Sequence, residues 1–249
     1  MTSTIYILWL RQIKRYLRSK PRIIGSLGQP LLFLLALGFG FGPIYAKAGH
    51  GSYIEFIGPG VIAMAIIFTA MFTGIELIWD RQFGFLKETL VAPVSRLEII
   101  IGRILGGATV SIFQGIIVFL IACIAGFRPV NVLMIPLALA FMFLIALLFT
   151  ALGTAIAARM EDMQAFPLIM NFIMMPMFFL SGAIFPLEGL PKAILTIASI
   201  DPLSYGVDGL RIALTGQSHF GLFMDFSVLA VITSLLVIAG VYLFSKIEV

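Results

Sequence analysis

Six stretches of this chain are apolar over lengths close to what a helix needs to cross a lipid bilayer. A spanning helix takes about 20 mainly apolar residues, because each residue rises about 1.5 Å through a hydrocarbon core of about 30 Å. The stretches are 25–42, 58–79, 98–127, 131–158, 164–186 and 225–245. The pattern therefore predicts an all-α integral membrane protein with six transmembrane helices joined by short connections.

Residues 1–22 have a different pattern, in which apolar and basic positions alternate at helical spacing. Trp9 and Ile13 fall near one helix face, while Lys14 and Arg18 lie mostly on the other. Apolar and basic faces of this kind, with aromatic residues at the boundary, are typical of a helix in the membrane interface. We therefore expect an N-terminal amphipathic interfacial helix over 1–22, followed by a membrane domain. The alternative is a solvated basic tail.

Composition and charge exclude most soluble classes. The 249 residues are 61% hydrophobic and only 11% charged, whereas soluble domains carry about 25% charged residues. If the chain starts inside, only four of its 16 Lys and Arg residues fall in outer segments: Lys47, Arg128, Lys192 and Arg211. Because basic residues stay preferentially in the cytoplasm, we expect a multi-pass protein of the plasma (inner) membrane with both termini cytoplasmic. The net charge of +4 then reflects topology and contact with the lipid bilayer, and not binding of nucleic acid.

Motifs that carry out chemistry are missing from the sequence. It contains no G-x-x-x-x-G-K-[ST] phosphate loop and no H-E-x-x-H pair, so the chain does not hold ATP or zinc in those ways. Its one cysteine, Cys123, excludes an intrachain disulfide. We therefore predict no catalytic residue, no metal site and no cofactor in this chain. An intramembrane enzyme is the alternative, and it requires a catalytic constellation that the sequence does not show.

A few polar and soft side chains fall inside the predicted spans. Gln114 and Asn171 are polar groups at membrane depth, where such groups usually hydrogen-bond between helices; the alternative is a place along a transport pathway. Met174 and Phe178 lie in a span rich in Met and Phe. They would suit an apolar cargo, because Met adapts to varied shapes. The alternative for both is packing in the core or against lipid.

The connection over 81–98 combines charges with apolar residues. Phe83, Phe85 and Leu86 lie in a segment predicted to be cytosolic. Lipid does not account for apolar residues there, so they indicate docking on a partner; the alternative is contact with the membrane interface. Ser95 can cap the helix that follows.

The outer connection over 187–211 is too polar to span the membrane. Proline occurs beside it and within it, in Phe185-Pro186 and Asp201-Pro202, and closely spaced prolines fix a folded-back turn. Apolar residues recur at helical spacing between these prolines. We therefore expect one or two short helices lying at the outer surface, before the last span.

Two stretches resemble a known family, the ABC-2 type transporter permeases. DRQFGFLKETLVAPVSRLEIIIGRILGGA (80–108) looks like the region between that family's second and third spans. FFLSGAIFPLEGLPKAILTIASIDPLSYGVDGLR (178–211) resembles its C-terminal signature. The resemblance covers essentially the whole chain, and the first stretch is most similar to the daunorubicin-resistance and nodulation-factor exporter branch. Gln82 departs from that branch, where Glu is common.

The resemblance implies partners and roles for particular residues. Two permease subunits, expected here as a homodimer, would pair with two copies of a separate ATP-binding subunit that holds ATP and Mg. The chain is then not an enzyme on its own. Its 23–249 domain would contain a coupling helix at about 81–92 and an outer re-entrant segment at about 180–211. The coupling helix would contact the ATPase through Arg81, Phe83, Phe85, Leu86, Lys87 and Glu88. An outer gate would include Phe185, Pro186, Pro202 and Arg211.

These observations together predict a transporter and leave its cargo open. The function expected from the resemblance is the membrane subunit of an ATP-driven exporter. It would move an amphipathic or lipid-like molecule, such as a drug-like compound or a lipid, out of the cytoplasm or inner leaflet. The first alternative is export of a lipid-linked glycan or polysaccharide. The second is a secondary carrier or channel that works without ATP.

Overall fold

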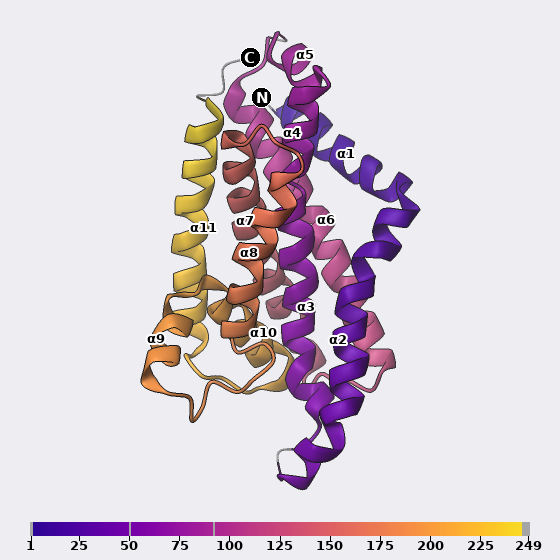
Figure 1. Cartoon of the computed structure of the whole chain (residues 1–249), viewed down its shortest axis with the longest axis vertical. Coiled ribbons are helices and arrows are strands. Elements are labelled where there is room, and N and C mark those ends of the chain that lie inside the picture. Colours follow the sequence, from indigo (N-terminus) through magenta and orange to yellow (C-terminus); the bar gives the residue numbers. More distant parts are fainter. Residues whose placement is uncertain (1, 50, 92, 246–249) are drawn as a thin grey trace.

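The structure is a computed structural model that describes residues 2–49, 51–91 and 93–245 (Figure 1). Within these residues the chain is helical and has no strand. Its elements are α1 (Thr2–Arg18), α2 (Lys20–Lys47), α3 (Tyr53–Phe72), α4 (Ile75–Gln82), α5 (Phe85–Val91), α6 (Arg96–Ile124), η1 (Val132–Met134), α7 (Ile135–Arg159), α8 (Ala165–Leu180), α9 (Lys192–Ile200), α10 (Pro202–Thr215) and α11 (Leu222–Ser245). The expected all-α membrane fold is confirmed.

Five helical stretches are long and apolar enough to cross a membrane. They are α2, the α3–α4 pair, α6, η1 with α7, and α11. The remaining predicted span, 164–186, corresponds to α8, which is apolar but has only 16 residues. At 1.5 Å per residue α8 is about 24 Å long, which is less than the full hydrocarbon core. Among the residues that the structure describes, five stretches are therefore long and apolar enough to be spans, and the shorter apolar helix α8 stands where a sixth was expected.

Helix α3 forms the centre of the bundle (Figure 1). Nearly all of its residues are buried, because it packs against α2, α6, α7 and α10. Its close passage beside α7 depends on glycine. A Cβ on Gly74 would lie 2.5 Å from the carbonyl oxygen of Gly153, and a Cβ on Gly153 would lie 2.6 Å from that of Met71. Small residues of this kind let helix backbones approach closely inside a membrane.

The bundle has two distinct ends, named here the α5 end and the α9 end. Helix α1 begins and α11 ends at the α5 end, and α9 and α10 lie at the opposite one (Figure 1). A guanidinium nitrogen of Arg96, at the start of α6, donates to the carbonyl oxygen of Ser245 at 2.6 Å. The first and last described helices thus reach the same side of the molecule.

Helix α1 crosses the α5 end obliquely and packs on α6 (Figure 1). A Cβ on Gly102 of α6 would lie 2.9 Å from the Cβ of Leu8, so glycine makes room for α1. The indole N–H of Trp9 donates to the Thr109 hydroxyl at 2.9 Å. Other apolar side chains of α1 face outward. These are Tyr6, Ile7 and Leu17.

Helix α10 corrects one expectation, because it does not lie at the surface. It packs against α3, α7 and α11 and is buried along most of its length. Asp201 caps it by accepting the backbone N–H of Leu203 at 2.9 Å, and Pro202 takes the first helical position. Gly216 ends it with a left-handed φ of 73°. The polar residues in 187–211 suggested a surface helix. Asp208 and Arg211 are instead buried, and they bond to backbone groups of loops that lie outside this segment.

Candidate functional site

The segment expected to form one coupling helix over 81–92 is divided by a turn. α4 ends at Gln82, and Gly84 then has a φ of 81°, a left-handed conformation that glycine adopts without steric cost. α5 follows as a separate short helix, and Ala92 lies outside the described residues. The expected single helix is therefore corrected to a helix end, a turn and a second helix.

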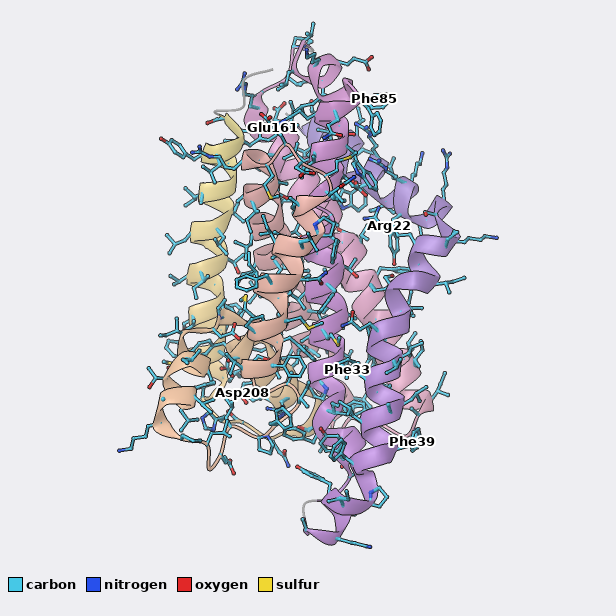
Figure 2. The ribbon with its side chains drawn as sticks, in the orientation of Figure 1. Arg22, Phe33, Phe39, Phe85, Glu161 and Asp208 are labelled. Carbon is cyan, nitrogen blue, oxygen red and sulfur yellow. The ribbon has the colours of Figure 1, made fainter. Side chains whose placement is uncertain are left out.

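Two aromatic side chains project from this turn and from α5. Phe83 is 67% exposed and Phe85 is 50% exposed, and Lys87 and Glu88 are exposed beside them. Figure 2 shows Phe85 at the α5 end of the molecule. Leu86, expected as a third exposed anchor, is instead fully buried. Its side chain fixes α5 to the bundle, so it is not available to a partner.

Arg81 and Gln82 bind the chain itself. Arg81 donates to the carbonyl oxygens of Ala158 at 3.0 Å and Met160 at 3.2 Å. A cation suits these free carbonyls at the end of α7, so Arg81, which was expected to contact the ATPase, binds the chain itself in this structure. The Gln82 amide donates to the carbonyl oxygen of Glu161 at 2.7 Å. A carboxylate has no N–H to donate there, which gives a structural reason for glutamine where the related branch often has Glu.

A cluster of buried charges lies next to α5 and joins several helices. Glu76 and Asp80, one turn apart on α4, are each 3% exposed. Asp80 forms an ion pair with Arg103 of α6, and Glu76 accepts a hydrogen bond from Arg22 of α2. A buried carboxylate without a partner is costly. These pairs therefore hold α2 and α6 against α4.

Helix α1 contributes two further arginines at the edge of this cluster. Guanidinium nitrogens of Arg11 and Arg15 lie 3.5 Å and 3.8 Å from Asp80 Oδ1. The Arg15 guanidinium also lies 5.7 Å from the ring centre of Trp79, within reach of a cation–π contact. Both arginine side chains are more than one third exposed, so water screens their attraction to the carboxylate. The ion pairs of Arg11 and Arg15 therefore bind α1 to α4 more weakly than the buried Arg103–Asp80 pair binds α6 to α4.

Two charged side chains of α10 are buried near the α9 end. Asp208 accepts the backbone N–H of His219 at 3.0 Å, and thereby fixes the loop before α11. Arg211 donates to the carbonyl oxygen of Gly182 at 2.8 Å and lies 4.5 Å from the ring centre of Phe56. Burial lowers the pKa of Arg211, and the nearby Asp208 carboxylate opposes that shift. The expected gate residue Arg211 thus joins α10 to α3 and to the end of α8.

Two cavities of different character occur at this end. A cavity of about 530 Å³ between α2 and the end of α8 is lined mainly by Phe33, Leu37, Phe41, Phe179, Phe185 and Pro186. Figure 2 shows Phe33 on α2 and Asp208 at the α9 end. A second cavity, of about 590 Å³, is lined mainly by Tyr45, Pro186, Glu188, Asp208, Arg211 and His219. Of the expected gate residues, only Pro202 lines neither cavity.

The four residues expected along a pathway do not share one surface. Gln114 is fully buried in α6 and accepts a hydrogen bond from the Tyr16 hydroxyl of α1. Met174 and Phe178 are buried on the inner face of α8, whereas Asn171 is exposed on its other face. Gln114 therefore acts as a link between helices in this conformation, and Asn171 faces away from the bundle.

The comparison with known proteins assigns the family. Residues 3–215 match the family model described as ABC-2 type transporter. The chain belongs to the ABC-2 type transporter family. It is 28% identical over 211 residues to nodulation protein J of Rhizobium leguminosarum bv. viciae, which covers 84% of this chain and 81% of that protein. It is 30% identical over 217 residues to a transport permease, ycf38, of Pyropia yezoensis, covering 85% of this chain and 74% of that protein.

Membership in the ABC-2 type transporter family confirms the resemblance carried by 80–108 and 178–211. The chain is a multi-pass membrane transport subunit of this family. The comparison includes a second nodulation protein J, from Rhizobium leguminosarum bv. trifolii, at 30% identity over 214 residues, with 85% of this chain and 79% of that protein covered.

The buried charge cluster of this ABC-2 type transporter was not among the predicted site residues. Glu76 and Asp80 have the i, i+4 spacing that places two side chains on one helix face. Two acids so placed at the end of an apolar span require cations, and basic residues are abundant in 11–22. That combination is the signal that could have indicated the cluster, although it does not say which arginine meets which acid.

Proposed function

We propose that this ABC-2 type transporter is the membrane subunit of an ATP-driven exporter for an amphipathic or lipid-like molecule. Two copies of the chain would combine with two copies of a separate ATP-binding subunit, which binds ATP and Mg. The α5 end, with both termini, would face the cytoplasm of a plasma membrane. Cargo would leave the cytoplasm or the inner leaflet and pass toward the α9 end.

The exposed aromatic pair Phe83 and Phe85 is the observation that carries this proposal. Both side chains stand at the α5 end, outside the apolar span, next to the exposed charges of Lys87 and Glu88. Aromatic anchors surrounded by charged residues are typical of protein interfaces. A soluble ATP-binding subunit that covers both rings would remove their exposed apolar surface from water, which favours binding.

The contacts around α5 supply a route from that surface into the bundle. Leu86 fixes α5 to the core, and Arg81 and Gln82 fix the end of α4 to the connection between α7 and α8. The Glu76 and Asp80 pairs then join α4 to α2 and α6. Movement of the ATP-binding subunit would therefore shift several helices together, as a rigid-body transition requires.

The cavity between α2 and α8 supports an apolar or amphipathic cargo. Its walls are aromatic and aliphatic, and Phe185 and Pro186 of the expected gate lie at one side. Its volume of about 530 Å³ is that of a drug-sized binding site. An apolar wall of this kind would bind a lipid chain or a drug-like molecule and would disfavour a free ion.

The neighbouring cavity favours a second candidate cargo, a lipid-linked glycan. Asp208, Arg211 and His219 line it together with the aromatic ring of Tyr45. Polar side chains beside an aromatic ring offer hydrogen bonds and a stacking surface to a sugar. Stimulation of ATP hydrolysis by a lipid-linked saccharide, and not by an apolar drug, would favour this cargo.

The test is to isolate the chain from its native membrane with any phosphate-loop protein that it retains, and to measure ATP hydrolysis by the complex in lipid nanodiscs. Phe83→Ala/Phe85→Ala should reduce affinity for the ATP-binding subunit by at least about 30-fold, because truncating a buried aromatic anchor costs about 1 kcal/mol or more. Membrane insertion should be unchanged, since neither side chain is in the core.

The matched control is Leu133→Ala/Phe223→Ala, which removes two large apolar side chains that are each 86% exposed, away from the α5 end. This control should keep the ATP-binding subunit bound and active. Equal losses in both variants would contradict a docking site at α5. Transport by the chain alone, without any ATP-binding subunit, would show an ATP-independent carrier and overturn the proposal.

A further inference from the structure

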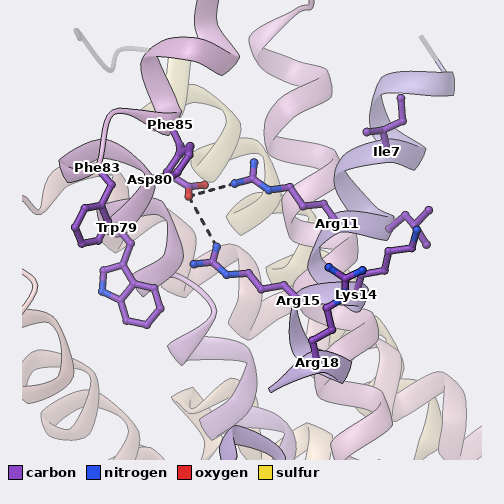
Figure 3. A pocket seen from close by; sticks show the side chains of 10 residues that line it. Ile7, Arg11, Lys14, Arg15, Arg18, Trp79, Asp80, Phe83 and Phe85 are labelled. Atoms are coloured by element: carbon purple, nitrogen blue, oxygen red, sulfur yellow. Dashed lines mark hydrogen bonds and ion pairs between the residues drawn. The ribbon is translucent and has the colours of Figure 1, made fainter. Parts of the chain in front are cut away.

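A cavity of about 650 Å³ opens between α1 and the turn that joins α4 to α5 (Figure 3). Its α1 wall carries Arg11, Lys14, Arg15 and Arg18. These positions follow the i, i+3, i+4, i+7 spacing of one helix face. The sequence predicted a basic face on this helix, and the structure places that face over a cavity.

The cavity has more positive charge than its own acids neutralise. Asp80 is its only acidic lining residue, and it is already paired with Arg103. Figure 3 shows Arg11 and Arg15 reaching toward Asp80 across the cavity. Within the described part of the chain, the side chains of Lys14 and Arg18 make no hydrogen bond or ion pair. Arg15 also lies 3.7 Å from Glu76 Oε2, so the four cations of α1 face two carboxylates that Arg22 and Arg103 already pair. The excess of positive charge leaves a site that attracts an anion.

The opposite wall of the cavity is aromatic. Trp79, Phe83 and Phe85 line it (Figure 3), and Ile7 on the α1 wall is 61% exposed. Indole rings favour the headgroup level of a bilayer. A basic face opposite exposed apolar side chains suits a ligand that has both a negative group and hydrocarbon chains.

We propose that this cavity binds the phosphate group of an anionic phospholipid from the leaflet at the α5 end. The phosphate would lie among Lys14, Arg18 and the outer sides of Arg11 and Arg15, with the acyl chains along Ile7. The lipid would bridge α1 and the α4–α5 turn. Without the lipid, the ion pairs between these two elements at Asp80 are the long contacts to Arg11 and Arg15. The proposal goes beyond export and does not depend on it, because this binding needs neither ATP nor transport.

The mixed character of the walls favours a lipid over other anions. A free phosphate ion would use the basic residues but would leave Ile7 exposed to water. An acidic side chain from a protein partner would bring one charge to a face that offers four cations. A phospholipid satisfies both the basic residues and Ile7, leaves the exposed faces of Phe83 and Phe85 to the ATP-binding subunit, and is present wherever this helix meets the membrane.

The test measures binding to the full chain in neutral detergent, with dihexanoyl phosphatidylglycerol as the probe and Trp79 fluorescence as the readout. The chain has two tryptophans, so a Trp9→Phe background isolates the signal of Trp79. Native mass spectrometry of the chain with both tryptophans gives a second measure of retained lipid. We expect saturable binding of phosphatidylglycerol, with phosphatidylcholine at least about tenfold weaker.

Lys14→Gln/Arg18→Gln is the test variant, because both side chains line the cavity and neither bonds to the described fold. It should weaken binding about 30-fold, from about 1 kcal/mol per basic residue and a factor of ten per 1.4 kcal/mol. Lys20→Gln/Arg159→Gln is the matched control. It removes two exposed cations outside the cavity and should change binding by less than about threefold.

Each contrary result has a distinct meaning. Equal weakening in the test and control variants would show general attraction of the basic protein to anionic lipid, and would overturn a built site. Inorganic phosphate that saturates the Trp79 signal at the same concentration would remove the lipid from the proposal. A Trp79 response to the ATP-binding subunit and not to any phospholipid would make the cavity a protein-docking site instead.

Discussion

Replacing Asp80 by Asn should destabilise the α5 end more than replacing the arginine with which it pairs. Asp80 is the acid that faces three arginines, Arg103 from α6 and Arg11 and Arg15 from α1. The substitution keeps the size of the side chain, removes its charge and replaces one acceptor oxygen by an NH2 group. Its effect therefore reports on ion pairing and not on packing.

The magnitude follows from the burial of each partner. Arg103 is 6% exposed, and its Nε atom already lacks a hydrogen-bond partner within the described residues. In Asp80→Asn this cation would be buried without a counter-charge, which costs about 3–5 kcal/mol. In Arg103→Met the carboxylate would keep Arg11 and Arg15, which can move closer, so we expect a loss of about 1–2 kcal/mol.

The combined variant completes the argument. Asp80→Asn/Arg103→Met leaves no buried charge at this position, and replacing a whole buried pair is often nearly neutral. We expect it to fall within about 2 kcal/mol of the unmodified protein, including the small contribution of the exposed arginines.

The free energy of unfolding would be measured by denaturant titration in mixed micelles, followed by far-ultraviolet circular dichroism. Arg11→Gln serves as a control with an expected loss below about 1 kcal/mol, because that side chain is 41% exposed. Equal losses for Asp80→Asn and Arg103→Met would refute the asymmetry. A combined loss equal to the sum of the two single losses would show that the charges are not coupled.

Three further predictions concern packing, pH and topology. Gly153→Ala should lose about 2–3 kcal/mol in the same titration because its methyl group would meet the α3 backbone, whereas Gly40→Ala, with open space around it, should be neutral or stabilising. Burial raises the pKa of Asp201 to about 7, so the folded state binds a proton that the unfolded chain releases near pH 4. The stability that this proton contributes is complete below about pH 4 and is lost as pH rises through about 7. The melting temperature should therefore be higher at pH 5 than at pH 8, and Asp201→Asn should remove that difference. In a background without the native cysteine, single cysteines at Lys87 and Lys192 should be labelled from the cytoplasmic and outer sides respectively, and a reversed pattern would contradict the orientation.

The sequence correctly predicted features that depend on residues close to one another in the chain, such as helix caps. Ser95 accepts the backbone N–H of Glu98 at 3.2 Å, as expected for the cap of α6. The predicted span 58–79 lies within one stretch, Tyr53–Gln82, that is long enough to cross a membrane. The short interruption at Thr73 and Gly74 inside it was not predicted, because hydropathy is continuous there. The break occurs where α3 passes Gly153 of α7, and hydropathy carries no information about a neighbour that is distant in sequence.

Contacts between distant segments account for the other differences. Leu86 looked like its neighbours Phe83 and Phe85, but the turn at Gly84 directs it into the core. Arg211 was expected at an outer gate, and the structure buries it with the carbonyl of Gly182 as its partner. In each case the residue type was compatible with two environments, and only the three-dimensional arrangement selected one.

The burial of α10 has a consequence for biogenesis. Two of the helices that enclose it, α3 and α7, precede it in the chain, and the third, α11, follows it. During synthesis α10 would emerge before its enclosure is complete, with the charges of Asp208 and Arg211 still needing water. It can take its place only when α11 has entered the membrane, so insertion of the C-terminal helix would complete the assembly of the permease. A chain that ended before Leu222 would leave α10 without its third enclosing helix.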